Sequence, residues 1–232
     1  MRLLIVCIIS LMVISGCSWL GPKVEEKESG IEHIGGKYNL TLHNVEITRG
    51  DSTFTIKRIS YEKEGEMIDP DQILPDEMRP GLDWLKANSP EDAVVMAWWD
   101  YGNAIRAYAE REPVIDGPSK EILTKTVSKH IGKNPEEIEC NNCIAHERID
   151  DVANLLVSED SSYVSGIMQK YSASYLYINK GDEGKSRAIF ISAGKEQKDI
   201  SSTIIGKALG KERINGFELA YDDNACVIYK LL

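Results

Sequence analysis

The chain has 232 residues, of which 42% are hydrophobic and 28% are charged. These fractions exclude a wholly disordered chain, a membrane protein with many spans and a disulfide-dense small domain. The formal net charge of −10 disfavours nucleic acid as a partner, because binding to phosphates depends on Lys and Arg side chains. We therefore expect an acidic globular protein, with either one domain and a tail or two small domains.

The first 16 residues have the pattern of an export signal. Met1-Arg2 precedes an apolar run from Leu3 to Ile14, which is too short to span a bilayer but has the length of a signal-peptide core. Residues 14–17, Ile-Ser-Gly-Cys, resemble the prokaryotic lipobox, in which the cysteine takes a lipid. We expect residues 1–16 to be removed and Cys17 to anchor the chain at the extracytoplasmic face of the cell membrane. Loss of Arg2 changes the net charge from −10 to −11. The alternative is a signal peptide cut at a small residue, with an incidental cysteine.

Two segments precede the main domain. Residues 17–36 are polar and charged and show no apolar period, which predicts a flexible tether. In residues 37–75, apolar and polar residues alternate on both sides of a polar turn from Arg49 to Ser52, which predicts a β-hairpin. A connector rich in Asp and Pro follows around Asp69-Pro70-Asp71.

Residues 76–232 alternate between helical and strand patterns, which predicts an α/β (mixed α+β) domain with a small central sheet and interleaved helices, preceded by the N-terminal hairpin. Ser119 ends a turn and is suited to cap a helix. We expect strands at 93–97, 174–179, 188–193, 217–221 and 226–231. We expect helices after Pro80 and at 102–110, 122–131, 149–157, 162–171 and 200–209.

The densest group of chemistry-bearing residues is the WWDYG cluster, Trp98-Trp99-Asp100-Tyr101-Gly102, directly after a predicted buried strand. Indole N–H groups donate hydrogen bonds, a carboxylate accepts them, and aromatic rings supply apolar walls, so the cluster suits a small ligand or side chain that carries a hydroxyl. Core packing explains either Trp alone, and a helix cap explains Asp100 alone. Neither explains the five residues together.

The WWDYG cluster resembles the signature of the oligosaccharyltransferase catalytic subunit family, whose members attach a lipid-linked glycan to Asn in Asn-x-Ser/Thr. The lead-in from Leu82 to Val95 and the closing hairpin are similar to that family as well. The stretch from Asp182 through Lys185 to Ile189 fits the spacing DxxKxxxI, one archaeal and eukaryotic form of the second family motif. The likeness covers residues 78–232, within a globular domain that we delimit as residues 76–232.

The resemblance implies a binding site for the acceptor peptide. Its members come from both motifs: Trp98, Trp99, Asp100, Tyr101, Gly102, Lys185 and Ile189. In the family, Trp and Asp of the signature bind the hydroxyl of the acceptor Ser or Thr, and the Lys and Ile complete the same pocket. Two of these residues have an equally good structural explanation, Lys185 as a solvated surface lysine and Ile189 as a core strand residue.

The resemblance also implies what this chain lacks. Family enzymes carry a large membrane region that holds the metal and activates the acceptor amide, so we expect no catalytic residue, no metal and no cofactor here. We expect an archaeal cell-surface lipoprotein that binds Asn-x-Ser/Thr peptides as an accessory protein of N-glycosylation. The alternatives are a globular component that acts with a separate membrane glycosyltransferase, and a structural lipoprotein of the cell envelope.

A second group of residues comprises Cys140, Cys143 and His146. Two Cys and a His could supply three zinc ligands, but a structural site usually needs four. Outside the cell, a disulfide between Cys140 and Cys143 is the expected state, and a redox-active pair is less well supported. This pairing leaves Cys226 as a free cysteine, which we expect to be buried in the last strand.

Overall fold

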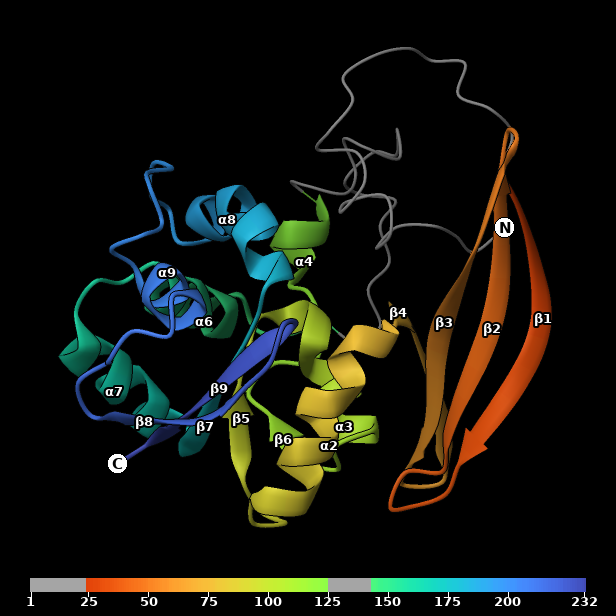
Figure 1. The fold of residues 1–232 in the computed structure, drawn as a ribbon, viewed down its shortest axis with the longest axis horizontal. Helices are drawn as coiled ribbons and strands as arrows, with labels where there is room; N and C mark the ends of the chain where they lie inside the picture. Colours follow the sequence, from red (N-terminus) through yellow and green to blue (C-terminus); the bar gives the residue numbers. More distant parts are fainter. Residues whose placement is uncertain (1–23, 125–142) are drawn as a thin grey trace. The chain divides into compact units, whose positions relative to one another are not determined.

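A computed structural model of the chain describes residues 24–124 and 143–232 (Figure 1). The chain divides into two compact units, Met1–Arg79 and Pro80–Leu232. In the described residues, the first unit contains a four-stranded sheet and the second a five-stranded sheet. None of the helices in these two ranges is long and apolar enough to cross a bilayer.

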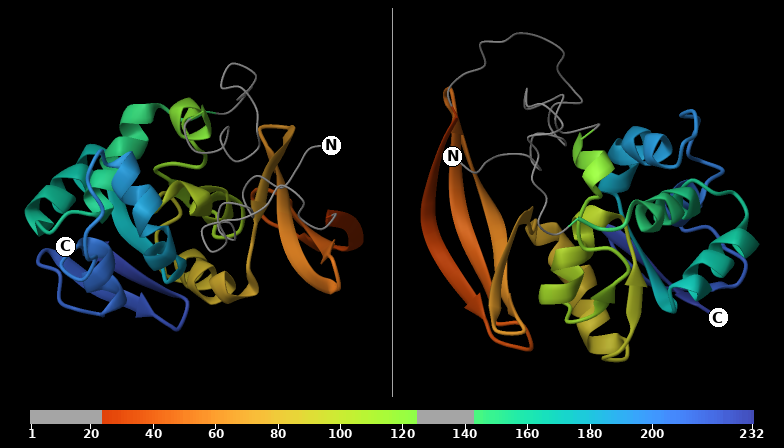
Figure 2. Two further views of the ribbon diagram at one scale, coloured as in Figure 1. Left: turned by 90° about the horizontal axis from the view of Figure 1, so that it is seen from above. Right: turned by 180° about the vertical axis from the view of Figure 1, so that it is seen from behind.

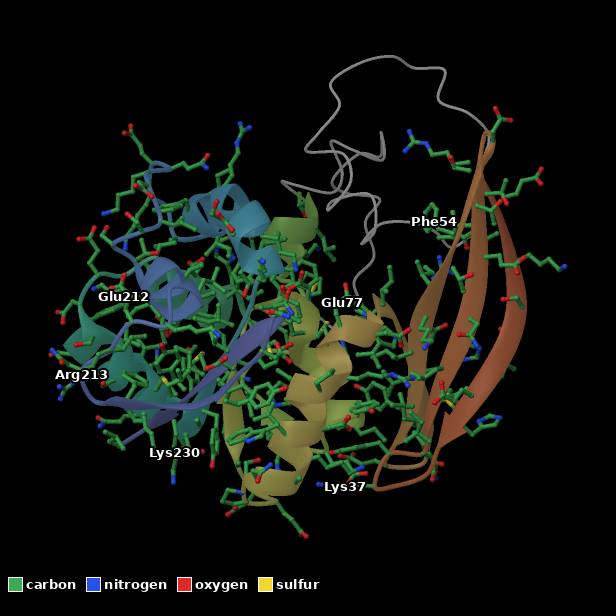
Figure 3. The ribbon with its side chains drawn as sticks, in the orientation of Figure 1. Lys37, Phe54, Glu77, Glu212, Arg213 and Lys230 are labelled. Carbon is green, nitrogen blue, oxygen red and sulfur yellow. The ribbon has the colours of Figure 1, made fainter. Side chains whose placement is uncertain are left out.

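The first unit is an antiparallel meander. Strands β1 (Val24–Ile34), β2 (Leu40–Arg49), β3 (Ser52–Lys63) and β4 (Glu66–Ile73) pair in chain order, and the 3₁₀ helix η1 (Asp76–Met78) follows. The expected hairpin is confirmed as β2 and β3, with its turn at Gly50 and Asp51. Leu42 and Ile59 lie opposite each other on these strands and are buried. Phe54 lies near the turn with its ring exposed (Figure 3).

Two segments that we expect to lack regular structure are strands instead. Residues 24–34 of the predicted tether form β1, and the Asp69-Pro70-Asp71 segment of the predicted connector lies in β4. Both strands are sheet edges, so each pairs on one side only, and an edge tolerates charged residues and proline. Ion pairs add to the backbone pairing, such as the 3.0 Å contact from Arg58 Nη2 to Glu26 Oε1. Residues 17–23 lie outside the described residues.

The second unit has a mixed sheet, which confirms the predicted α+β class. Its strands are β5 (Val94–Met96), β6 (Glu112–Pro113), β7 (Ala173–Asn179), β8 (Phe217–Asp222) and β9 (Cys226–Leu231), in the spatial order β6-β5-β7-β9-β8. Strand β5 is parallel to β6 and β7, whereas β9 is antiparallel to β7 and β8. The helices are α2 (Arg79–Asn88), η2 (Trp99–Tyr101), α3 (Gly102–Ala107), α4 (Lys120–Ile122), α6 (His146–Leu156), α7 (Ser161–Lys170), α8 (Gly181–Ser192) and α9 (Ile204–Leu209).

Helices cover both sides of this sheet, with α2 and α3 on one side and α6, α7, α8 and α9 on the other (Figures 1 and 2). The ring of Trp84 in α2 lies 6.2 Å from the ring of Tyr175 in β7, in an edge-on arrangement. Gly81 allows α2 to approach closely, because a Cβ atom there would lie 2.3 Å from Cys226 Sγ in β9. The core of the unit therefore lies on both faces of the sheet.

One expected strand is a helix. Residues 188–192, at the start of the strand that we expect at 188–193, belong to α8. The buried residues of α8 include Asp182, Ser186 and Ile189, at helical spacing. Because two of these three are polar, the apolar pattern of the sequence does not reveal the helix. Ser119 caps α4 as expected, with its Oγ accepting a 3.1 Å hydrogen bond from Ile122 N, and most of the helix expected at 122–131 lies outside the described residues.

Candidate functional site

The two sequence motifs follow two neighbouring parallel strands. The WWDYG cluster comes directly after β5, and the DxxKxxxI stretch comes directly after β7, which pairs with β5 in parallel. In the sheet, β6 lies on one side of β5 and β7 lies on the other side, although the chain forms the strands in the order β5, β6, β7. Such a reversal of strand order opens a crevice at the carboxyl ends of the strands, where α/β proteins bind ligands. Both motifs therefore lie at the expected position for a binding site.

The WWDYG cluster has a tight backbone conformation. Trp98 is extended, with φ −62° and ψ 146°, and its carbonyl accepts a 3.1 Å hydrogen bond from Tyr101 N, which closes the turn of η2. Gly102 opens α3, and a Cβ atom there would lie 2.0 Å from the carbonyl oxygen of Ile115. The glycine of the signature thus has a steric role, since any other residue would displace the neighbouring chain.

Lys185 of α8 reaches the WWDYG cluster. Its Nζ atom donates hydrogen bonds to Asp100 Oδ2 and, at 2.7 Å, to the hydroxyl oxygen of Tyr101. The same Nζ lies 4.3 Å from the centre of the Tyr101 ring. The Lys185 and Asp100 side chains keep 22% and 13% of their surface exposed, so a ligand in solution can reach this ion pair. The structure therefore brings Lys185 together with Asp100 and Tyr101.

Asp182 joins the same network, although its role is not predicted from the sequence. Its Oδ1 accepts a 2.7 Å hydrogen bond from the Tyr101 hydroxyl, and its Oδ2 accepts one of 3.0 Å from Asn179 N. Complete burial raises the pKa of Asp182 to about 7, with the Lys185 charge acting in the opposite direction. The available signal is its position one helical turn before Lys185, which places both residues on one face of α8.

Burial also keeps Tyr101 in its neutral form. The Tyr101 side chain is buried, which raises its pKa well above the usual value, and the nearby Asp182 and Asp100 carboxylates act in the same direction. Its hydroxyl therefore remains a donor to Asp182 and an acceptor from Lys185. The hydroxyl thus connects residues of the first motif to residues of the second.

The two tryptophans differ in exposure. Trp98 is 3% exposed and Trp99 is half-buried, and their ring centres are 6.3 Å apart. In the part of the chain that the structure describes, neither indole N–H has a hydrogen-bond acceptor. These two donors and the Asp100 carboxylate are the groups that a hydroxyl, which both donates and accepts, would need.

Ile189 is the predicted site residue that has no exposed surface. It lies one turn after Lys185 in α8, and its side chain is fully buried in the core of the second unit. Its apolar side chain therefore supports α8 from within. Its role at the site stays a prediction, as do those of the other predicted residues.

The cysteines fall in different parts of the chain. Cys143 is disulfide-bonded, and Cys140, the partner that we expect, lies outside the described residues, as does Cys17. Cys226 is a free, buried cysteine, as expected, and burial raises the pKa of its thiol to about 12. His146 begins α6 and contacts Ser119 Oγ at 3.1 Å. Within residues 24–124 and 143–232, no group of three His, Cys, Asp or Glu side chains is placed to hold a metal ion.

A comparison with protein families identifies the chain. The model of the STT3/PglB/AglB core domain matches residues 91–206, which is half of the chain. This chain belongs to that family. The matched range contains the WWDYG cluster and the stretch from Asp182 to Ile189, so the resemblance seen in the sequence is confirmed. The chain therefore carries an oligosaccharyltransferase-like globular domain, which is related to proteins of N-glycosylation.

Several curated relatives are similar over short stretches. The dolichyl-diphosphooligosaccharide–protein glycosyltransferase subunit stt-3 of Caenorhabditis elegans is 44% identical over 46 residues, which are 20% of this chain and 6% of the relative. The dolichyl-phosphooligosaccharide-protein glycotransferase 2 of Pyrococcus horikoshii is 53% identical over 36 residues, which are 16% of this chain and 5% of the relative. The STT3 subunit of Saccharomyces cerevisiae is 34% identical over 80 residues, which are 34% of this chain and 10% of the relative. This chain thus matches at most a tenth of the length of these three relatives.

Two solved structures from Archaeoglobus fulgidus are also similar. The C-terminal globular domain of an oligosaccharyltransferase is 20% identical, with a TM-score of 0.48, and the match covers 68% of this chain and 99% of that one. The archaeal oligosaccharyltransferase AglB, solved with an inhibitory peptide and a dolichol-phosphate, is 15% identical with a TM-score of 0.46. That match covers 65% of this chain and 23% of AglB.

Proposed function

We propose that this chain binds the Asn-x-Ser/Thr segment of acceptor proteins through the WWDYG cluster and Lys185, as an accessory protein of N-glycosylation. The observation that carries the proposal is the meeting of the two motifs. Lys185 Nζ from α8 donates hydrogen bonds to Asp100 and Tyr101 from η2, across more than 80 positions of sequence. Family membership over residues 91–206 supports the same role for both motifs.

The chemistry of the site suits a hydroxyl. Asp100 offers a carboxylate oxygen that can accept the hydroxyl proton, and the indole N–H groups of Trp98 and Trp99 can donate to the hydroxyl oxygen. Lys185 holds the Asp100 carboxylate in place through its ammonium group. A peptide with Ala in place of Ser or Thr would leave these polar groups without a partner, and a site of this kind discriminates strongly against such a ligand.

We assign recognition to this chain, because the two motifs that meet at Lys185 are those for which the resemblance implies binding of the acceptor peptide. We place it at the extracytoplasmic face of the membrane, anchored by a lipid on Cys17, on the strength of the pattern in residues 1–17. A separate membrane glycosyltransferase would then carry out the transfer. Recovery of that transferase with the tagged chain from solubilised membranes would support this arrangement, and its absence would count against it.

The experiment is a calorimetric titration of the chain with matched Asn-x-Thr and Asn-x-Ala peptides. A hydrogen bond to a charged group contributes about 1.5–3 kcal/mol, so we expect the Thr peptide to bind at least about tenfold more tightly. The variant Lys185→Met should weaken Thr-peptide binding, whereas Lys180→Met, an exposed lysine beside α8, should not. Equal binding of the two peptides by the unaltered chain would refute the proposal.

A structural role for the cluster is the second candidate, and the burial of Trp98 and Tyr101 favours it. The variant with Ala at Trp98, Trp99 and Asp100 separates the two. If the cluster is purely structural, the unaltered chain shows no selectivity for the Thr peptide, and the variant has a lower thermal stability. If the cluster binds the peptide, the unaltered chain is selective for the Thr peptide and the variant is not.

A further inference from the structure

A small cavity lies at the C-terminal end of α8, away from the WWDYG cluster. Its volume is about 270 Å³, and it is bounded by α4, by one side of α6 from His146 to Asn154 and by residues 191–194. Figures 1 and 2 show α4 beside α8. Pockets for drug-sized ligands have volumes of roughly 300–1,000 Å³, so this cavity suits a single side chain better than a cofactor.

The polar lining of the cavity consists mainly of hydrogen-bond acceptors. Glu121 and Asp150 contribute carboxylates, and the buried Asp150 Oδ1 accepts no hydrogen bond from the described residues. His146 also lines the cavity and contacts both carboxylates, with its Nε2 3.3 Å from Asp150 Oδ1 and its Nδ1 3.6 Å from Glu121 Oε2. The amide of Asn154 donates to the Asp150 carbonyl at 3.0 Å, which leaves the amide oxygen of Asn154 as a further acceptor. A ligand that fits this lining must supply donors.

The end of α8 adds to the negative potential of the cavity. Gly194 ends the helix with φ +65°, its N–H donates to the Ile191 carbonyl at 3.0 Å, and Lys195 N donates to the Phe190 carbonyl at 2.9 Å. The C-terminus of a helix carries the negative end of the helix dipole and favours a cation nearby. The carboxylates of Glu121 and Asp150 and this helix end therefore favour the same charge on a ligand.

Apolar side chains line the rest of the cavity. Ile122, Ile191 and Ala193 border it, and Ile191 is 63% exposed, which is unusual for an isoleucine in a helix. Long basic side chains bury their methylene stems on apolar surface and keep their charged ends among polar groups. We propose that this cavity binds a Lys or Arg side chain of the acceptor peptide, with its stem against the isoleucines and its charged end among Glu121, Asp150 and Asn154.

The position of the cavity fixes where the basic residue lies in the peptide. Ser192, at the cavity, comes seven positions after Lys185 and lies on the same face of α8. Two helical turns correspond to roughly 10 Å, and an extended peptide advances roughly 3.3 Å per residue. The basic residue therefore lies about three positions from the hydroxyl residue. This inference rests on the proposed function, since it takes the hydroxyl to be bound at Asp100 and Lys185.

The test measures the affinity of the chain for Asn-x-Thr peptides in which one Lys is moved along the peptide, with norleucine as the neutral reference. A favourable ion pair at a partly exposed site contributes up to about 1 kcal/mol, so we expect about fivefold tighter binding with Lys at the third position on one side of the Thr. This gain should disappear in Glu121→Gln and in Asp150→Asn. It should persist in Glu218→Gln, an exposed residue of β8 that carries the same charge.

The outcomes separate this inference from the proposed function. Selectivity for Thr over Ala with no dependence on the position of Lys would overturn the inference alone. A Lys effect that is present without any selectivity for Thr would overturn the proposed function and keep a cation-binding cavity. An equal Lys effect in the unaltered chain and in Glu121→Gln, whose side chain lies at the surface, would also overturn the inference.

Discussion

At the scale of single residues, the site depends on one lysine that lies between two carboxylates. Lys185 contacts Asp100 directly and reaches Asp182 through the Tyr101 hydroxyl. The sequence predicts Lys185 and Asp100, because both occupy positions of family motifs. It does not predict that Asp182 is buried, because an acidic residue in the first turn of a helix is equally suited to solvent. Asp182 is buried where the start of α8 meets Tyr101, whose hydroxyl donates to it from 81 positions away in the sequence, and no local pattern indicates that contact.

The pH dependence of stability follows from Asp182. Its pKa is near 3.8 in the unfolded chain and about 7 in the folded chain, because burial disfavours the charged form. Between these pH values the folded chain binds more protons than the unfolded one, so this carboxyl lowers the free energy of unfolding as the pH rises from about 4 to about 7. Asp182→Asn should flatten this decline in a series of urea unfolding curves.

Asp199→Asn is the matched control. Hydrogen bonds from Ser201 lower the pKa of the exposed Asp199, so this carboxyl contributes stability that is lost as the pH falls through its folded value. Its replacement should leave the decline between about pH 4 and pH 7 in place. An unchanged decline in Asp182→Asn would contradict the assignment of the effect to Asp182.

At the scale of elements, local pattern predicts those helices and strands that bury an apolar face. The hairpin of β2 and β3 and the closing hairpin of β8 and β9 follow from alternation, and α6 follows from its apolar period. Strand β1 is mostly polar, with apolar residues only at Val24, Ile31 and Ile34, and depends on pairing with β2, so no alternating apolar pattern marks it. Strand β6 has only two residues, Glu112 and Pro113, so it is too short to show an alternation of apolar and polar residues. The helix α8 buries polar residues and is therefore mistaken in part for a strand.

Two glycines of the second unit should respond to substitution in opposite directions. Gly102→Ala should destabilise the fold by about 3 kcal/mol, the upper end of the usual cost of overpacking, because its Cβ would lie 2.0 Å from the Ile115 carbonyl oxygen. Gly184→Ala should stabilise it by about 0.5–1 kcal/mol, because Gly184 lies in α8 with open space around it and alanine favours a helix. Thermal and urea unfolding measure both changes. A neutral Gly102→Ala would show that η2 and α3 are not held against residue 115.

At the scale of the whole molecule, the site is a product of strand order. The sequence predicts strands before both motifs, and the structure shows that β5 and β7 are parallel neighbours although 76 residues lie between Met96, the end of β5, and Ala173, the start of β7. Which strands become neighbours depends on the packing of the whole sheet, so the meeting of the two motifs could be expected only from the family resemblance. The cavity beside α4 also depends on the packing of the whole unit, because it joins three elements that are distant in sequence, and neither the local pattern nor the resemblance predicts it.

Membrane anchoring is tested by expressing residues 1–232 in an archaeal or bacterial host. With Cys17 lipidated, the protein should partition into the detergent phase of a Triton X-114 extraction, and Cys17→Ser should move it to the aqueous phase or leave it unprocessed. Cys7→Ser, which changes a cysteine inside the apolar run, is the control and should leave partitioning unchanged. Identical partitioning of all three proteins would contradict a lipid on Cys17.

The most direct measurement of the central claim is a double-mutant cycle between the peptide hydroxyl and Asp100. The ratio of affinities for Asn-x-Thr and Asn-x-Ala peptides is determined in the unaltered chain and in Asp100→Asn, which keeps the shape of the side chain and removes its charge. If Asp100 binds the hydroxyl, the ratio should fall several-fold in the variant, because a hydrogen bond to a neutral amide contributes about 0.5–1.5 kcal/mol and one to a charged group about 1.5–3 kcal/mol. The same ratio in both proteins would show that the hydroxyl is recognised elsewhere, and would contradict the account.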